Sequence, residues 1–148
     1  MALPLFTGSG DLPLGVHSAS LGDVLDRFGA SSAQREALAF RLEHIYQVAR
    51  ASGHLARFVV FGSFVTAKLE PNDVDVFLLM EDTFDASRLT GEAQVLFDHA
   101  GAQALFGASV FWLRRLAAFE GEQKTIEYWQ VKRGNGRRGI VDIIPEAP

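Results

Sequence analysis

Residues 58–80 read FVVFGSFVTAKLEPNDVDVFLLM, and this stretch decides the fold. It begins and ends with apolar runs rich in β-branched and aromatic residues, which predict two strands, the first of them buried on both faces. Gly62 and Ser63 end the first strand, and a short helical turn followed by a Pro-Asn turn leads to the second strand at 74–80. The stretch therefore predicts a strand, a polar loop and a second strand.

Gly62 and Ser63 have the chemistry of a phosphate-binding turn. Glycine has no side chain, so the backbone at Gly62 can approach a phosphate closely. Ser63 offers a hydroxyl and an N–H at what reads as a helix N-terminus, where free backbone donors and the helix dipole favour an anion. Lys68 follows five residues later and either reaches a terminal phosphate or is a solvated lysine at a helix end. Gly62, Ser63 and Lys68 are the candidate nucleotide-binding residues.

Asp73 and Asp75 stand where the chain enters the second strand. Residues two apart in a strand point to the same face, with about 7 Å of backbone between them. Two such carboxylates repel each other unless a cation lies between them, and Mg²⁺ binds carboxylate oxygens together with substrate phosphates. Asp73 and Asp75 are thus candidate metal ligands and catalytic residues. A phosphate-binding turn beside a divalent cation indicates phosphoryl or nucleotidyl transfer.

Each of these features also has an ordinary structural explanation. A Gly-Ser pair after a strand is usually just a turn, Asp73 fits a turn or a cap, and Asp75 fits a charge that protects a strand edge. Their order along the chain favours the functional interpretation, because an accidental match of all the parts is much rarer than a match of one.

In this order of parts the sequence resembles the polymerase-beta-like nucleotidyltransferase superfamily, most closely its minimal, stand-alone bacterial and archaeal members. The superfamily pattern is an apolar strand, Gly-Ser, a variable stretch, and Asp-x-Asp inside a second strand. Within the superfamily the chain resembles a group of short proteins with four further landmarks, which extend the likeness over most of the sequence. Those landmarks stand here at Leu12-Pro13-Leu14-Gly15-Val16-His17, Arg27-Phe28-Gly29, Gly62 to Lys68, and Arg138-Gly139-Ile140-Val141.

The resemblance implies an enzyme that moves NMP from an NTP to a protein side chain or an RNA end and releases pyrophosphate. It implies that Gly62 and Ser63 hold the triphosphate and that Asp73 and Asp75 bind two Mg²⁺ ions around the α-phosphate. It also implies a partner protein, since minimal members resemble parts of two-gene toxin–antitoxin or phage-defence systems.

The third carboxylate of the superfamily, usually on the following strand, has no evident counterpart. Ser109 stands at the expected position, and serine is a poor Mg²⁺ ligand. Asp142 is the remaining strand-borne acid downstream and is the candidate third catalytic residue; if an arginine pairs with it, it is structural. The alternative to an active enzyme is an impaired module of the same fold that binds a nucleotide or a partner protein. The two hypotheses differ in whether an acid faces Asp73 and Asp75.

The rest of the chain predicts helices and strands in alternation, which favours an α/β (α+β) fold with helices packed on a small mixed sheet. We expect one nucleotidyltransferase-like domain over 1–148, with 1–18 as an N-terminal arm. The predicted elements are a helix at 21–28 capped by Ser20, a helix from Ser31 to Gly53, a helix at 88–105, a strand at 109–113, a segment at 114–127 that favours helix over strand, and a hairpin of 128–133 with 139–144 around Gly134-Asn135-Gly136.

Composition sets outer limits on function. The 148 residues are 48% hydrophobic and 22% charged, which is typical of a folded soluble protein. The absence of cysteine excludes disulfides, a thiolate zinc site and a cysteine nucleophile. No apolar run approaches the roughly 20 residues of a membrane span, so we expect a cytoplasmic protein.

Charge argues against a general DNA-binding role. The formal net charge is −4, whereas proteins that coat nucleic acid are normally basic. A local basic cluster nevertheless surrounds the predicted hairpin turn, and it either binds RNA or nucleotide phosphates or is simply solvated. Its members are Lys132, Arg133, Arg137 and Arg138.

Overall fold

The central feature of the fold is the antiparallel pair of strands β2 (Leu55–Phe61) and β3 (Val74–Met80). The structure is a computed structural model and describes residues 3–132, 134 and 136–145. β3 has the predicted bounds, whereas β2 begins three residues before the predicted strand. The register sets Asp75 of β3 directly opposite Phe61 of β2.

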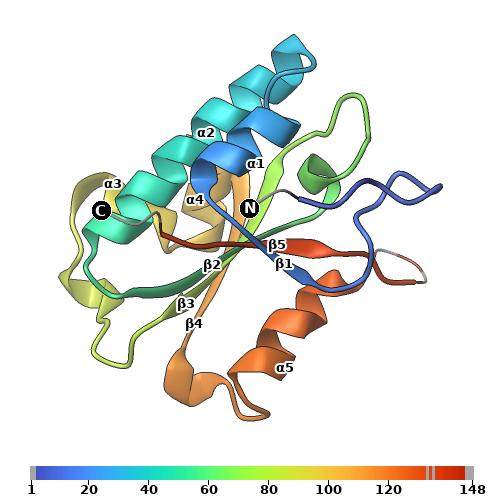
Figure 1. Cartoon of the computed structure of the whole chain (residues 1–148). Coiled ribbons are helices and arrows are strands. Elements are labelled where there is room, and N and C mark those ends of the chain that lie inside the picture. The colour runs from blue at the N-terminus through green and yellow to red at the C-terminus, as the bar shows by residue number, and fades with distance from the viewer. Residues whose placement is uncertain (1–2, 133, 135, 146–148) are drawn as a thin grey trace.

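Five strands form one mixed sheet within the described residues, in the order β1-β5-β2-β3-β4. β1 is Val16–Ala19, β4 is Ala108–Arg114 and β5 is Ile140–Ile143. β1 is parallel to β5 and β3 is parallel to β4, while β2 is antiparallel to both of its neighbours. The α/β prediction of a small mixed sheet is therefore confirmed, and Figure 1 shows segments from the two ends of the chain side by side in it.

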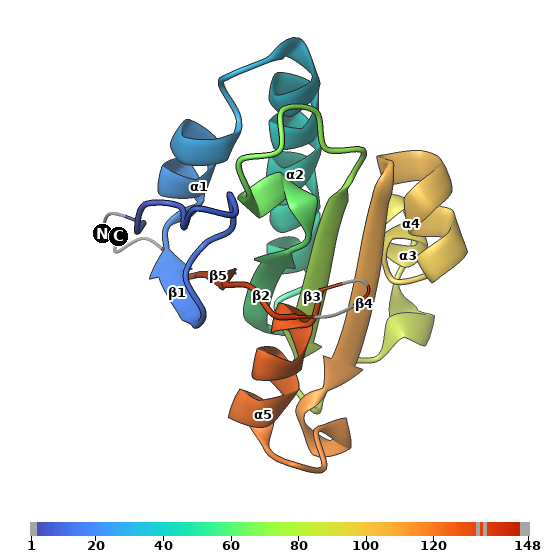
Figure 2. The ribbon, with the colours of Figure 1, turned by 90° about the vertical axis from the view of Figure 1, so that its right-hand side faces the viewer.

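Helices α1 to α4 pack on one face of this sheet and α5 on the other (Figures 1 and 2). The alternation along β3 sorts its side chains: Val76 and Leu78 belong to the core under α1 to α4, whereas Phe77 and Leu79 pack with Ile126 of α5. The helices are α1 Leu21–Phe28, α2 Ala33–Ala51, α3 Gly91–Leu96, α4 His99–Phe106 and α5 Glu122–Glu127. No helix within the described ranges is long and apolar enough to cross a membrane.

The helix ends follow side-chain caps. Ser20 caps α1 as predicted, accepting a hydrogen bond from the backbone N–H of Asp23 at 3.1 Å. α2 starts after Ser32 rather than Ser31, because the Ser32 hydroxyl is the one that caps the first turn. The single helix predicted over 88–105 is wrong: Asp98 caps a new helix there, which separates α3 from α4.

The predicted hairpin is also wrong. Tyr128–Gln130 is a 3₁₀ turn and not a strand, and β5 pairs with β1 and β2 instead. Of the hairpin only a bridge between Val131 and Arg137 remains among the described residues, while residues 133 and 135 lie outside them. Three of the four residues of β1 lie within the predicted arm, where the sequence predicts no strand, and they form one because they pair with β5.

Candidate functional site

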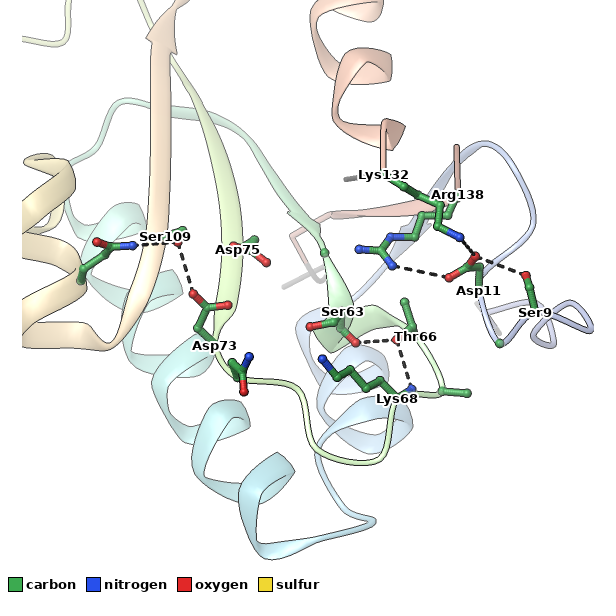
Figure 3. Close-up of a pocket in the computed structure, with 15 residues that line it drawn as sticks. Ser9, Asp11, Ser63, Thr66, Lys68, Asp73, Asp75, Ser109, Lys132 and Arg138 are labelled. Carbon is green, nitrogen blue, oxygen red and sulfur yellow. Dashed lines mark hydrogen bonds and ion pairs between the residues drawn. The ribbon is translucent and has the colours of Figure 1, made fainter. Parts of the chain in front are cut away.

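A pocket of about 770 Å³ lies where the loop after β2 meets the starts of β3 and β4 (Figure 3). The loop contributes Gly62, Ser63 and Lys68. The N-terminal segment contributes residues 9–11, and the segment before β5 contributes Lys132 and Arg138. The chain thus brings parts of the sequence more than a hundred residues apart to one cavity.

Asp73 and Asp75 both line this pocket; Asp75 lies in β3, and Asp73 directly precedes that strand. Both are half-buried, and Asp75 lies beside Ser109 of the parallel neighbour β4. The sheet therefore presents the two carboxylates on the same side as Gly62 and Ser63. The geometry is that of a polar site at one end of the central strands.

Ser109 occupies the position at which the resemblance implies a third carboxylate. Its hydroxyl donates to Asp73 Oδ2 at 3.3 Å and accepts from Gln103 Nε2 at 3.2 Å. The neutral hydroxyl of Ser109 thus contacts Asp73 from the position at which the resemblance implies a third carboxylate. Among the described residues, no group of three or more His, Asp or Glu side chains lies together in a way that could hold a metal ion.

Gly62 fits the site because any side chain there would overlap the carboxylate of Asp75. Its φ of 79° is a backbone conformation that other residues rarely adopt. The predicted helix after it is a single 3₁₀ turn, Ser63–Val65, and this is too short to supply a helix dipole. What remains for an anion is the Ser63 hydroxyl and the Lys68 side chain, which Figure 3 shows directed into the pocket.

Gly62→Ala is expected to destabilise the fold by about 2–4 kcal/mol, because a left-handed backbone strain adds to the overlap with Asp75. Gly53→Ala is the matched control: Gly53 has a similar φ of 76°, and nothing lies within 4 Å of its added Cβ. Urea unfolding of both variants measures the difference. Equal losses would show that backbone strain alone, and not the contact with Asp75, makes glycine necessary at position 62.

Arg35 holds the loop in place from behind. It is 3% exposed, and its guanidinium donates five hydrogen bonds to four backbone carbonyl oxygens. Three of these oxygens belong to the loop, at Phe64, Thr66 and Lys68, and the fourth is that of Phe28. Burial lowers the pKa of Arg35 below its ordinary value. The loop's shape is thus fixed by a buried cation that is not part of the Gly-Ser and Asp-x-Asp pattern.

The far side of the pocket carries a second cluster of charge. Lys132 Nζ lies 2.9 Å from Asp11 Oδ2, and Arg138 lies 3.6 Å from Asp11 Oδ1. Ser9 donates to the same carboxylate at 3.2 Å. Burial alone would raise the pKa of Asp11, but the hydrogen bond from Lys132 and the charges of Lys132 and Arg138 hold it below the ordinary value. We call Lys132 and Arg138 together the basic wall.

The structure does not bring Asp142 into the pocket. Its carboxylate accepts a hydrogen bond from Arg57 Nε at 2.8 Å, and Arg57 also pairs with Glu122 of α5 at 3.1 Å. β5, which carries Asp142, is separated from β3 by β2, so the two backbones lie about 10 Å apart. Arg57 therefore ties β2 to β5 through Asp142 and to α5 through Glu122. This pairing of Asp142 with an arginine is the structural alternative that the sequence leaves open.

Asp142→Asn is expected to lower the free energy of unfolding by about 3 kcal/mol, because the side chain is only 7% exposed and its charge balances Arg57. Burial alone would lower the pKa of Arg57, but the hydrogen bonds and charges of Asp142 and Glu122 raise it, which agrees with a favourable pair. Glu122→Gln, at a more exposed partner, should cost under about 1 kcal/mol. The nucleotide affinity of Asp142→Asn should equal that of the unmodified protein. A loss of affinity in a folded variant would show that Asp142 does take part in the binding site.

Arg35 and Asp11 contribute to this site and are not among the candidate residues that the sequence identifies. Arg35 had a signal, since it continues the apolar stripe of α2 that includes Leu38, Leu42 and Ile45, where a charge needs buried partners. Asp11 had none, because only the pairing of β1 with β5 brings the N-terminal segment to Lys132.

A model of a protein family described as a family of unknown function (DUF6932) matches residues 4–144, which include all the described residues that line the pocket. No curated protein and no solved structure matches the sequence.

Proposed function

The chain belongs to DUF6932, a family of unknown function, and we propose from its pocket that it is a Mg²⁺-dependent nucleotidyltransferase. In this proposal it moves NMP from a nucleoside triphosphate to a hydroxyl of a protein or an RNA end. The observation that carries the proposal is the fit of Asp75 against Gly62, which places an acid pair directly beside a Gly-Ser loop.

The donor set fits one or more Mg²⁺ ions shared with a substrate. Asp73 and Asp75 supply carboxylate oxygens into a polar pocket, and Mg²⁺ in proteins is commonly held by one or two carboxylates plus substrate phosphates. When bound, Mg²⁺ would neutralise charge on the phosphate oxygens and polarise the phosphorus. Ser109 keeps the Asp73 carboxylate oriented toward the pocket through its hydrogen bond.

The other residues of the pocket suit a phosphate chain. Ser63 offers its hydroxyl next to the acid pair, and Lys68 adds a cation from the same loop. Among the described residues, the charged ones that line the pocket are three acids and three bases, so bound Mg²⁺ would leave a positive site for a polyanion. The acids are Asp11, Asp73 and Asp75, and the bases are Lys68, Lys132 and Arg138.

The test is binding followed by transfer. Calorimetry with each nucleoside triphosphate, in Mg²⁺ and again in EDTA, should show binding that requires the metal. Incubation of the full chain with triphosphates labelled at the α-phosphate, with and without cell lysate, should then yield a labelled protein or RNA and free pyrophosphate. Absence of Mg²⁺-dependent binding for all four nucleotides would overturn the proposal.

A second candidate function is a catalytically impaired module that binds a nucleotide or a partner protein. Ser109 favours it, because a neutral hydroxyl cannot supply the charge or the proton acceptor of a third carboxylate. The two candidates give different results in the same assay: the module binds Mg²⁺-nucleotide and transfers no label. Ser109→Asp discriminates further, since a restored acid should raise a weak transfer rate or create one.

A further inference from the structure

The basic wall lies across the pocket from the acid pair and is built from segments that the Gly-Ser and Asp-x-Asp pattern does not include (Figure 3). Lys132 and Arg138 come from the segment before β5, and Asp11 comes from the segment before β1. The pairing of β1 with β5 brings both segments together, and the backbone N–H of Gly139 donates to the carbonyl of Leu12 at 3.0 Å. The basic wall therefore forms only when the fold brings these two distant segments together.

The two cations of the wall are held differently. The Lys132 ammonium makes a short contact with Asp11, whereas the longer contact of Arg138 leaves its guanidinium directed into the pocket. Their side chains are 32% and 22% exposed, so both are accessible from the pocket. Asp11, with a side chain 11% exposed, contacts both of them. The Asp11 carboxylate thus occupies the place beside these cations where an incoming anion would bind.

We propose that Lys132 and Arg138 bind the terminal phosphates of the ligand, and that Asp11 is the anion which these two cations exchange for the phosphates. The inference rests on the proposed function, because it takes the ligand of the pocket to be a nucleoside triphosphate. A carboxylate and a diphosphate at the same two cations repel each other, so binding there proceeds by exchange and not by simple addition.

The moving part is the side chain of Lys132 and not the N-terminal segment. Backbone hydrogen bonds fix that segment, from Ala67 N–H to Gly10 O at 2.8 Å and from Thr7 N–H to Asp11 O at 2.8 Å. Lysine has a flexible four-carbon stem and three donors, so its ammonium can turn from a carboxylate to a phosphate without backbone movement. Arginine adds a planar fork suited to phosphate oxygens.

Calorimetric titration of the full chain with inorganic pyrophosphate tests the exchange. Lys132→Met and Arg138→Met should each bind pyrophosphate about tenfold more weakly, the effect of one charge-assisted hydrogen bond. Asp11→Asn should bind it about fivefold more tightly, because a competing anion is gone. Asp26→Asn is the matched control: it changes net charge equally at an exposed position of α1 outside the pocket. In the Asp11→Asn/Lys132→Met double variant the gain should shrink, since the two residues act on one contact.

The direction in which Asp11→Asn changes pyrophosphate affinity tests whether Asp11 is exchanged for phosphate. Weaker binding would show that Asp11 only positions the cations and would overturn the exchange. Unchanged pyrophosphate affinity in Lys132→Met and Arg138→Met would remove the subsite while leaving Mg²⁺-dependent nucleotide binding by Asp73 and Asp75 intact. Failure of every nucleotide and of pyrophosphate would instead overturn the proposed function. A short RNA oligonucleotide that depends on the basic wall when pyrophosphate does not would assign the wall to RNA and overturn the inference.

A measurement on the unmodified chain guards against an unfolded Asp11→Asn variant. The carboxyl ¹³C resonance of Asp11 at neutral pH should shift when pyrophosphate saturates the pocket, because the carboxylate loses the Lys132 hydrogen bond. Orthophosphate, which cannot span both cations as well, should shift it less at equal concentration. An Asp11 resonance that stays in place at saturation would contradict the exchange.

Discussion

Replacing Arg35 by methionine is expected to lower the free energy of unfolding by about 3–5 kcal/mol. The change leaves four carbonyl oxygens without their donor in a region where Arg35 itself is 3% exposed. An unsatisfied buried acceptor costs about 1–3 kcal/mol, although water that enters the gap offsets part of the sum. Such a loss is a large fraction of the total stability of an ordinary domain, and urea unfolding at low temperature measures it.

Arg88→Met is the control for this prediction, because its side chain is 87% exposed and the change should cost less than about 0.5 kcal/mol. Arg35→Lys should fall between the two at about 2 kcal/mol, since an ammonium keeps the charge but lacks the planar fork that reaches several carbonyls. Because Arg35 shapes the loop from Phe64 to Lys68, the folded lysine variant should also bind Mg²⁺-nucleotide more weakly. Wild-type stability in Arg35→Met would show that the five hydrogen bonds do not hold the loop.

The Asp73→Asn/Asp75→Asn double variant is expected to lose Mg²⁺-dependent nucleotide binding while the fold survives. Changes to residues that merely support metal ligands cost about 10- to 100-fold in affinity, so loss of both carboxylates should cost more than about 100-fold. Stability without metal should hold or rise slightly, because two nearby like charges are removed and the amide oxygen introduced at position 73 can still accept the hydrogen bond from Ser109. Calorimetry measures the first effect and thermal unfolding in EDTA the second.

Asp26→Asn again serves as the control for net charge, since it lies on the exposed side of α1. A sharp drop in the metal-free melting temperature of the double variant would show that Asp73 and Asp75 are structural. Unchanged Mg²⁺-dependent nucleotide binding in the double variant would show that Asp73 and Asp75 are not part of the nucleotide site. Either result removes the basis of the proposed function.

Short-range chemistry explains why the sequence alone predicted the centre of the fold. β3 has the bounds that its apolar run predicts, and the cap of α1 follows from a serine three residues before an acid. The same holds for the acid pair: Asp75 lies in β3 and Asp73 directly before it, so two positions close in sequence line one pocket. Each of these features depends on neighbours within a few positions, where the local pattern is the whole cause.

Tertiary structure decided the features in which distant segments meet. The run at Ile140–Ile143 reads as half of a hairpin, but it pairs with β1 and β2 because those strands offer a fully buried position that a local turn does not. The same pairing places Asp11 beside Lys132. Because β2 pairs with β5, Asp142 contacts Arg57 of β2 and does not join Asp73 and Asp75. A buried charged side chain pairs with an opposite charge that the fold brings close to it. The residues around it in the sequence do not indicate which partner this will be. The sequence alone therefore determined the strand–loop–strand unit and its two carboxylates, and only the assembled sheet determined which cations face them.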